Sequence, residues 1–204
     1  MTIQRLLPLI GLIMAVGIVS TSRAAGDAAA GKQKSQLCAA CHGPDGNSTN
    51  PIWPKLAGQS AEYINKELHD FQSGARNNAQ MKAMAGPLSG QDIENLAAYF
   101  SSQETKIGTA AKDSVKKGQS LYRAGDAQTG VPACMACHSP TGAGNPAAAY
   151  PMLHGQHAQY TVTQLNAFKS GARSNDPNAI MRTIAGRMTA GQIKAVAQYI
   201  QGLH

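Results

Sequence analysis

All four cysteines of this chain lie in two short segments of the same form. Cys38 and Cys41 belong to CAACH, Cys134 and Cys137 belong to CMACH, and each pair is followed at once by a histidine. The chain has 204 residues and keeps its only thiols in these two segments, so any account of the fold must explain both pairs and the histidine that follows each. These segments therefore constrain the fold more strongly than any other feature.

The two cysteine segments belong to a larger internal repeat. Residues 53–76 align without a gap to residues 150–173, with 12 of the 24 positions identical, and residues 81–100 align to residues 181–200. The offset between the copies is 97 to 100 residues, so each copy is a domain and not a short solenoid unit.

The N-terminus differs in character from the repeat. Arg5 precedes an uncharged, largely apolar run at 6–19 and small residues before Ala25, which is typical of a cleaved secretory signal. The run is short for a membrane span, which needs about 20 apolar residues. We predict an exported, periplasmic protein, with a retained N-terminal anchor as the alternative. The predicted division is a signal peptide at 1–24, an N-terminal domain at 25–104, a linker at 105–114 and a C-terminal domain at 115–204.

Both copies have the pattern of helices joined by loops. Apolar residues recur at helical spacing within 60–72, Ser89 is placed as an N-cap with Asp92 three residues later, and Thr189 and Gln192 form a capping box. No segment alternates as a strand would, so the fold class is all-α. Aromatic residues make up only 5% of the chain, which is little for two small domains. A bound group is therefore expected to fill much of each interior.

Three interpretations of the cysteine pairs compete. A redox dithiol of the thioredoxin kind needs a βαβ pattern, which is absent from the sequence. A four-thiolate zinc site would leave the two histidines without a role. Covalent attachment of c-type haem uses C-x-x-C-H as its motif, and it explains every member of both segments. We predict two such haems, held by thioethers to Cys38, Cys41, Cys134 and Cys137; a disulfide or reactive CxxC remains the alternative.

The predicted iron ligands come from the same repeat. His42 and His138 follow the cysteines and are the expected proximal ligands. Met81 and Met181 are equivalent in the two copies and are the expected distal ligands, with Met84 as the alternative in the first copy.

Other positions are expected to support these ligands or to stand apart from them. The carbonyls of Pro54 and Pro151 are expected to orient the two imidazoles, because a metal-bound histidine usually donates its second N–H to such a group. The competing interpretation is that these prolines only shape a turn. The remaining histidines have no counterpart in the other copy and are expected to be structural or exposed. They are His69, His154, His157 and His204.

Charge is distributed unevenly between the two halves. Residues 25–104 contain 6 Lys or Arg and 8 Asp or Glu, a net charge of −2, whereas residues 105–204 contain 10 and 3, a net charge of +7. A basic C-terminal half suits an acidic partner surface or anionic lipid, and a solvated basic face is the alternative.

Several motifs together resemble the dihaem cytochrome c4 family. They are AGDAAAGK, CAACHGPDGNS, PKLAGQ, LSGQDIENLAAYFSSQ, PACMACHSPTGAGN, GQHAQYT and IMRTIAGRM, followed by YIQGLH, and their order covers 25–204. The resemblance implies two tandem class I cytochrome c domains related by a pseudo-two-fold axis, with haem propionate edges meeting near the interface. It implies electron carriage in the periplasm, often at the membrane surface, from a cytochrome bc1 complex toward a terminal oxidase. Nucleic acid and small-molecule substrates are not expected.

His/Met ligation implies a carrier rather than an enzyme. It fills all six iron positions, so peroxide, nitrite or oxygen cannot bind unless a ligand leaves. The alternative is a catalytic dihaem protein, such as a peroxidase or the haem subunit of an oxidoreductase complex, which needs one open iron.

Overall fold

The computed structural model describes residues 26–204, so the predicted signal peptide lies outside the described residues. The N-terminal half contains five helices: α1 (Ala28–Lys34), α2 (Gln36–His42), α3 (Ala61–Ser73), α4 (Ala79–Ala85) and α5 (Gly90–Ser101). The C-terminal half repeats this order with α6 (Lys112–Ala124), α7 (Met135–His138), α8 (Ala158–Ser170), α9 (Ile180–Arg187) and α10 (Ala190–Gln201). Two short 3-10 helices, η1 (Pro146–Ala148) and η2 (Pro177–Ala179), precede α8 and α9.

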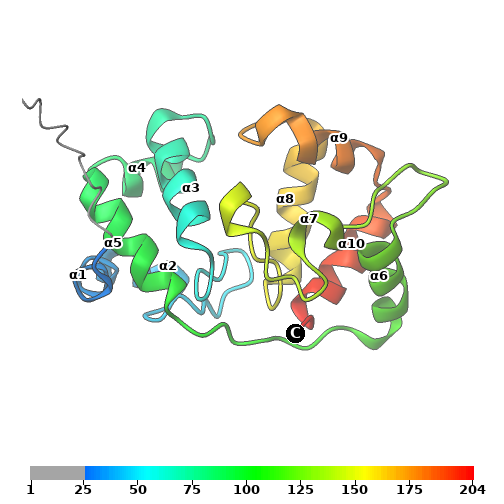
Figure 1. Cartoon of the computed structure of the whole chain (residues 1–204), viewed down its shortest axis with the longest axis horizontal. Helices are drawn as coiled ribbons and strands as arrows, with labels where there is room; N and C mark the ends of the chain where they lie inside the picture. The colour runs from blue at the N-terminus through cyan, green and yellow to red at the C-terminus, as the bar shows by residue number, and fades with distance from the viewer. Residues whose placement is uncertain (1–25) are drawn as a thin grey trace, which may run out of the picture.

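The two halves form two helical domains that lie side by side (Figure 1). The segment between α5 and α6 runs along one edge of the molecule as an extended connection. Helix α6 begins at Lys112, inside the linker predicted at 105–114. Within residues 26–204 there is no strand, only isolated bridges such as Asp126 to Val131, and the all-α prediction is confirmed.

In each domain the first helix crosses the last at very short range. α1 packs on α5, and α6 packs on α10. A Cβ atom on Gly31 would lie 2.0 Å from the backbone oxygen of Asn95, and one on Gly118 would lie 2.2 Å from that of Ala195. Only glycine permits the helices to approach this closely. Both domains therefore use a glycine where the first helix packs on the last.

The helix starts follow the predicted capping chemistry. Ser89 and Thr189 each accept a hydrogen bond from the backbone N–H three residues on, and the side chains of Asp92 and Gln192 accept from the N-cap N–H in return. The predicted N-cap at Ser89 and the predicted capping box at Thr189 are therefore confirmed, and Ser89 with Asp92 also forms a capping box. They fix where α5 and α10 begin, and these two helices supply much of the core.

Each domain has its own hydrophobic core around its last helix. In the N-terminal domain, Leu96 and Phe100 of α5 pack with Ile64 of α3. In the C-terminal domain, Ile193 and Val196 of α10 belong to a cluster that also contains Tyr122 of α6. Cys38 packs against the edge of the first cluster and Cys134 against the edge of the second, so each cysteine segment borders its own core.

No helix within residues 26–204 is both long and apolar enough to cross a membrane.

Candidate functional site

Each CxxCH segment forms a helix that ends at its histidine. α2 ends at His42 and α7 ends at His138. The following residues, Gly43 and Ser139, have φ of 80° and 67°, so the chain leaves the helix abruptly after each histidine. Helix α2 thus carries both thiols and the imidazole, and α7 carries Cys137 and the imidazole with Cys134 as its N-cap.

Both histidine rings are buried and are held by a backbone carbonyl. His42 is 6% exposed and its Nδ1 lies 2.8 Å from the oxygen of Pro54, whereas His138 is 8% exposed and its Nδ1 lies 2.9 Å from the oxygen of Pro151. The predicted orienting bonds are therefore present. With Nδ1 as the donor in each, Nε2 is the nitrogen that remains to bind a metal.

The surroundings keep these two imidazoles neutral. Burial lowers the pKa of His42 and of His138, and the hydrogen bonds to Pro54 and Pro151 oppose this effect without reversing it. A neutral imidazole is the form that ligates a metal.

The first thiol of each pair is not activated for redox chemistry. None of the four cysteines forms a disulfide. Burial, and to a lesser degree the neighbouring Cys41, raises the pKa of the Cys38 thiol, and burial raises the pKa of Cys134 to about 11. Redox-active CxxC cysteines have a lowered pKa instead, so this environment disfavours the dithiol alternative.

The zinc alternative has no geometric support. Among residues 26–204, no three His, Cys, Asp or Glu side chains come together as a metal-binding group. Paired uncommitted thiols beside a buried, carbonyl-bonded neutral histidine fit a covalently attached haem, because the thiols supply the thioethers and the ring supplies one axial ligand.

The two candidate distal methionines occupy matching helices. Met81 lies in α4 and Met181 in α9, and both are partly buried. Helix α4 is brought close to the first cysteine segment, since Nε2 of Gln80 lies 3.9 Å from Sγ of Cys41. Met84, the alternative in the first domain, is 39% exposed.

A buried charge cluster joins the domains, and sequence reasoning did not identify it. Nη1 of Arg76 and Nη2 of Arg173 both donate to Oε2 of Glu67, at 2.5 and 3.1 Å. Each guanidinium also donates to a tyrosine hydroxyl of the other domain, at 2.9 and 3.0 Å. Position 164, the repeat equivalent of Glu67, is Gln164, so one carboxylate serves two arginines. The repeated GAR at 74–76 and 171–173 was the available signal.

The histidines without a counterpart lie outside the two CxxCH segments. His157 forms the N-cap position of α8, and its Nε2 lies 2.9 Å from Oγ of Ser48 in the other domain. His154 and His204 contact nearby backbone carbonyls.

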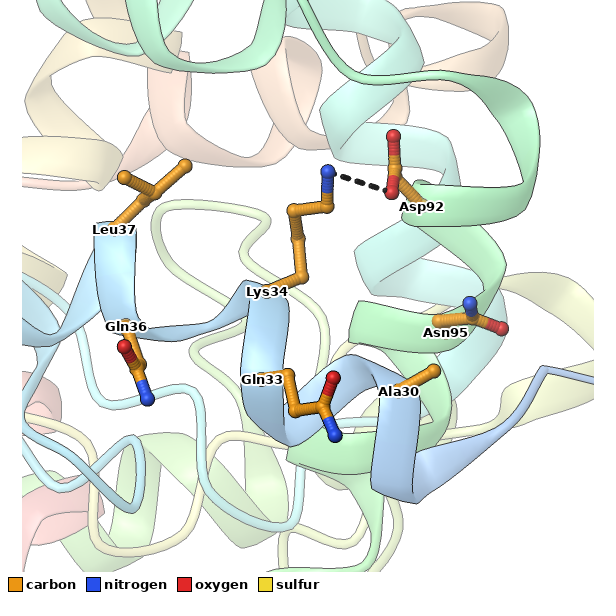
Figure 2. A pocket seen from close by; sticks show the side chains of 7 residues that line it. All are labelled: Ala30, Gln33, Lys34, Gln36, Leu37, Asp92 and Asn95. Atoms are coloured by element: carbon orange, nitrogen blue, oxygen red, sulfur yellow. Dashed lines mark ion pairs between the residues drawn. The ribbon is translucent and has the colours of Figure 1, made fainter.

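A surface hollow between α1, α2 and α5 is separate from the histidine sites. Figure 2 shows the ion pair of Lys34 Nζ and Asp92 Oδ1, 2.9 Å apart, in this hollow. Its lining contains no cysteine or histidine; the lining residues are Ala30, Gln33, Lys34, Gln36, Leu37, Asp92 and Asn95.

Comparison with known proteins agrees with this architecture. The Cytochrome c family model matches residues 28–104 and 115–204, once for each domain. Cytochrome c4 of Azotobacter vinelandii is 48% identical over 96% of this chain and 98% of its own length. The chain belongs to the cytochrome c4 family. It is a dihaem electron-transfer protein with two tandem cytochrome c domains, and it carries two covalent c-type haems.

Other members and neighbours place this cytochrome c4 in a wider group. The crystal structure of reduced cytochrome c4 from Pseudomonas stutzeri superposes with a TM-score of 0.86 at 47% identity, covering 88% of this chain and 100% of the other. A thiosulfate dehydrogenase electron acceptor from Thiomonas intermedia is 41% identical over 84% of this chain and 81% of its own length.

Proposed function

We propose that this cytochrome c4 is a periplasmic carrier that takes electrons from a bc1-type complex and passes them toward a terminal oxidase, without catalysis of its own. The duplicated proximal site carries this proposal: both imidazoles are buried and held by a proline carbonyl at 2.8 and 2.9 Å. Each haem, when bound, supplies a one-electron iron couple. Two equivalent, protected sites suit outer-sphere transfer between proteins better than substrate chemistry at one open metal.

The proposed site residues are the same in kind in each domain. Cys38 and Cys41 form the thioethers of the first domain, with His42 and Met81 as axial ligands. The exposure of Met84 supports the choice of Met81, because a ligand side chain turns inward. In the second domain the corresponding set is Cys134, Cys137, His138 and Met181.

The buried acids support a carrier rather than a peroxidase. Glu67 is bound by two arginines, and Asp176 accepts from the backbone N–H and the Nε of Arg182 at 2.9 and 2.8 Å. Carboxylates held in this way are poorly placed to move protons for bound peroxide. The Thiomonas relative is itself named as an electron acceptor, which supports exchange with protein partners.

The basic half offers a docking surface for such partners. Helix α6 exposes Lys112, Lys116, Lys117 and Arg123, and α10 exposes Lys194. We propose that this face meets an acidic partner surface, or anionic lipid at the membrane. Such complementarity raises the rate of encounter more than it raises affinity.

One set of measurements on the purified protein tests the proposal. The mass should equal that of residues 25–204 plus two haems, which reports signal cleavage and attachment together. The reduced protein should bind carbon monoxide slowly or not at all, and rapid native binding at one haem would refute the carrier function. A spectroelectrochemical titration of Met181→His should show one potential lowered, since His/Met ligation gives a higher potential than bis-His. Met84→Leu is the control, and loss of a Met–iron band in that variant would refute Met81.

A further inference from the structure

Two peptide groups next to the proximal histidines form hydrogen bonds on both sides. The peptide between Pro54 and Lys55 places its carbonyl 2.8 Å from Nδ1 of His42, and its N–H donates to Oε1 of Gln156 at 2.9 Å. Gln156 belongs to the other domain. The imidazole of the N-terminal domain is therefore connected, through one peptide group, to an amide side chain of the C-terminal domain.

The same arrangement occurs in the opposite direction. The peptide between Pro151 and Met152 places its carbonyl 2.9 Å from Nδ1 of His138, and its N–H donates to Oε1 of Gln59 at 2.9 Å. Lys55 and Met152 are equivalent in the repeat, as are Gln59 and Gln156. The two connections are thus crossed and related by the pseudo-symmetry of the domains.

The glutamine orientations are fixed by a second bond at each end. Nε2 of Gln156 donates to the oxygen of Lys55 at 2.9 Å, and Nε2 of Gln59 donates to the oxygen of Met152 at 3.0 Å. Because each amide faces one N–H and one carbonyl of the same residue, a flipped amide would pair donor with donor. Gln59 is 5% exposed and Gln156 is 9% exposed, so water competes little with these bonds.

A chain of hydrogen bonds in a buried setting polarises its members. An acceptor on the N–H of a peptide makes its carbonyl a stronger acceptor, and this draws the Nδ1 proton from the imidazole. A more polarised imidazole donates more electron density to a metal on Nε2 and favours the oxidised iron. The glutamines therefore lie where they can act on the iron potential without touching the iron or its ligand.

We propose that Gln156 and Gln59 are crossed positioning residues, each tuning the proximal histidine of the opposite domain through the intervening peptide group. Gln156 acts on His42, and Gln59 acts on His138. The inference rests on the proposed roles of these two histidines as iron ligands. It also makes two residues of the domain interface part of the redox sites, so displacement of either glutamine changes the potential of the haem in the opposite domain.

The test compares Gln156→Ala with Gln59→Ala in the holoprotein. In the reduced, diamagnetic protein, NMR of the imidazole Nδ1–H protons reads each hydrogen bond separately. Gln156→Ala should move the His42 Nδ1–H signal upfield and leave the His138 signal in place, and Gln59→Ala should do the reverse. The reduction potential of the haem in the opposite domain should rise. We expect the equilibrium constant for its reduction to increase a few-fold, where a tenfold increase corresponds to about 59 mV.

Two further variants separate tuning from a purely structural effect. Gln156→Glu keeps an acceptor for the Lys55 N–H whether or not it is ionised, so the His42 signal should return toward its native position. His157→Ala removes a different contact across the same interface, the one to Ser48, and should leave both Nδ1–H signals unmoved.

The pattern of the shifts decides the outcome. The proposal would be overturned if a glutamine variant moved only the Nδ1–H signal of the histidine in its own domain. Equal shifts of both Nδ1–H signals, or no shift of either, would also overturn it. Rapid carbon monoxide binding would refute the carrier function alone, because the Nδ1–H signals report the relay whether or not the protein is a carrier.

Discussion

Removal of the buried carboxylate at the domain interface, by Glu67→Gln, should strongly destabilise the protein. Glu67 is 6% exposed, and its Oε2 accepts from Arg76 at 2.5 Å and from Arg173 at 3.1 Å. Glutamine has almost the same shape and can accept one of these bonds. What it removes is the charge, which leaves two guanidinium groups facing each other in the interface beside Gln164.

The magnitude follows from the burial of the pair. Breaking a buried ion pair by removing one partner costs about 3–5 kcal/mol, and the retained acceptor places this case near the lower end. For a chain of this size, about 3 kcal/mol corresponds to a fall in Tm of roughly 6–12 °C. Thermal unfolding of the holoprotein, followed by circular dichroism, measures it.

The same contribution has a defined pH dependence. Burial alone would raise the pKa of Glu67, but the charges of Arg173, Arg76 and Lys66 outweigh burial and lower it. The stabilisation is therefore complete above the unfolded pKa of about 4.3 and is lost as the pH falls through the lower folded value. The difference in unfolding free energy between the native protein and the Glu67→Gln variant should stay constant from neutral pH to near 5. It should become smaller at more acidic pH.

The control is Glu62→Gln, an exposed carboxylate in the first turn of the same helix. It should change Tm by little, because an exposed charge is screened by solvent. If Glu67→Gln had no larger effect than this control, or if its effect persisted unchanged at pH 3, the assigned role of the ion pair would be wrong.

Two other predictions concern packing and docking. Gly31→Ala should destabilise the N-terminal domain by about 1–3 kcal/mol or more, because its Cβ would meet a backbone oxygen of α5. Gly90→Ala, with nothing within 4 Å, should be neutral or slightly stabilising, and equal melting of the two variants would contradict the proposed crossing. Stopped-flow electron transfer to an acidic partner should slow steeply as salt rises, and the charge-reversal variant Lys116→Glu should weaken that dependence. A rate independent of ionic strength would remove the docking role of α6.

Local sequence signals predicted the local structure well. The N-cap at Ser89, the capping box at Thr189 and the two proline carbonyls on the imidazoles all appear as expected. These features depend on residues that are close in sequence or that recur in both copies. The start of α6 at Lys112 was less predictable, because its first turn is polar and resembles a linker.

Contacts between the domains could not be derived in the same way. Gln156 meets Lys55 across 101 residues, and Arg173 meets Glu67 across 106, so both depend on how two finished domains dock. Docking geometry leaves no periodic pattern in a sequence. The repeat did carry a trace of it, because Gln59, Gln156, Arg76 and Arg173 fall at identical positions of the two copies. The repeat alone could not show that each of these residues contacts the opposite domain.

The two proximal sites are nearly identical. A difference in reduction potential between the two haems must therefore come from other parts of their surroundings. The two Nδ1 to carbonyl distances differ by only 0.1 Å, so the proximal hydrogen bonds give neither iron an advantage. The surroundings differ in charge: the N-terminal half has a net charge of −2, whereas the C-terminal half has +7. This difference favours oxidised iron in the N-terminal domain. In the proposed titration the lower potential should therefore belong to the N-terminal haem, and the reverse order would mean that distal ligation outweighs these charges. If the N-terminal haem has the lower potential, a protein that carries one electron holds it on the C-terminal haem. That haem belongs to the basic half, whose helix α6 is proposed to face an acidic acceptor.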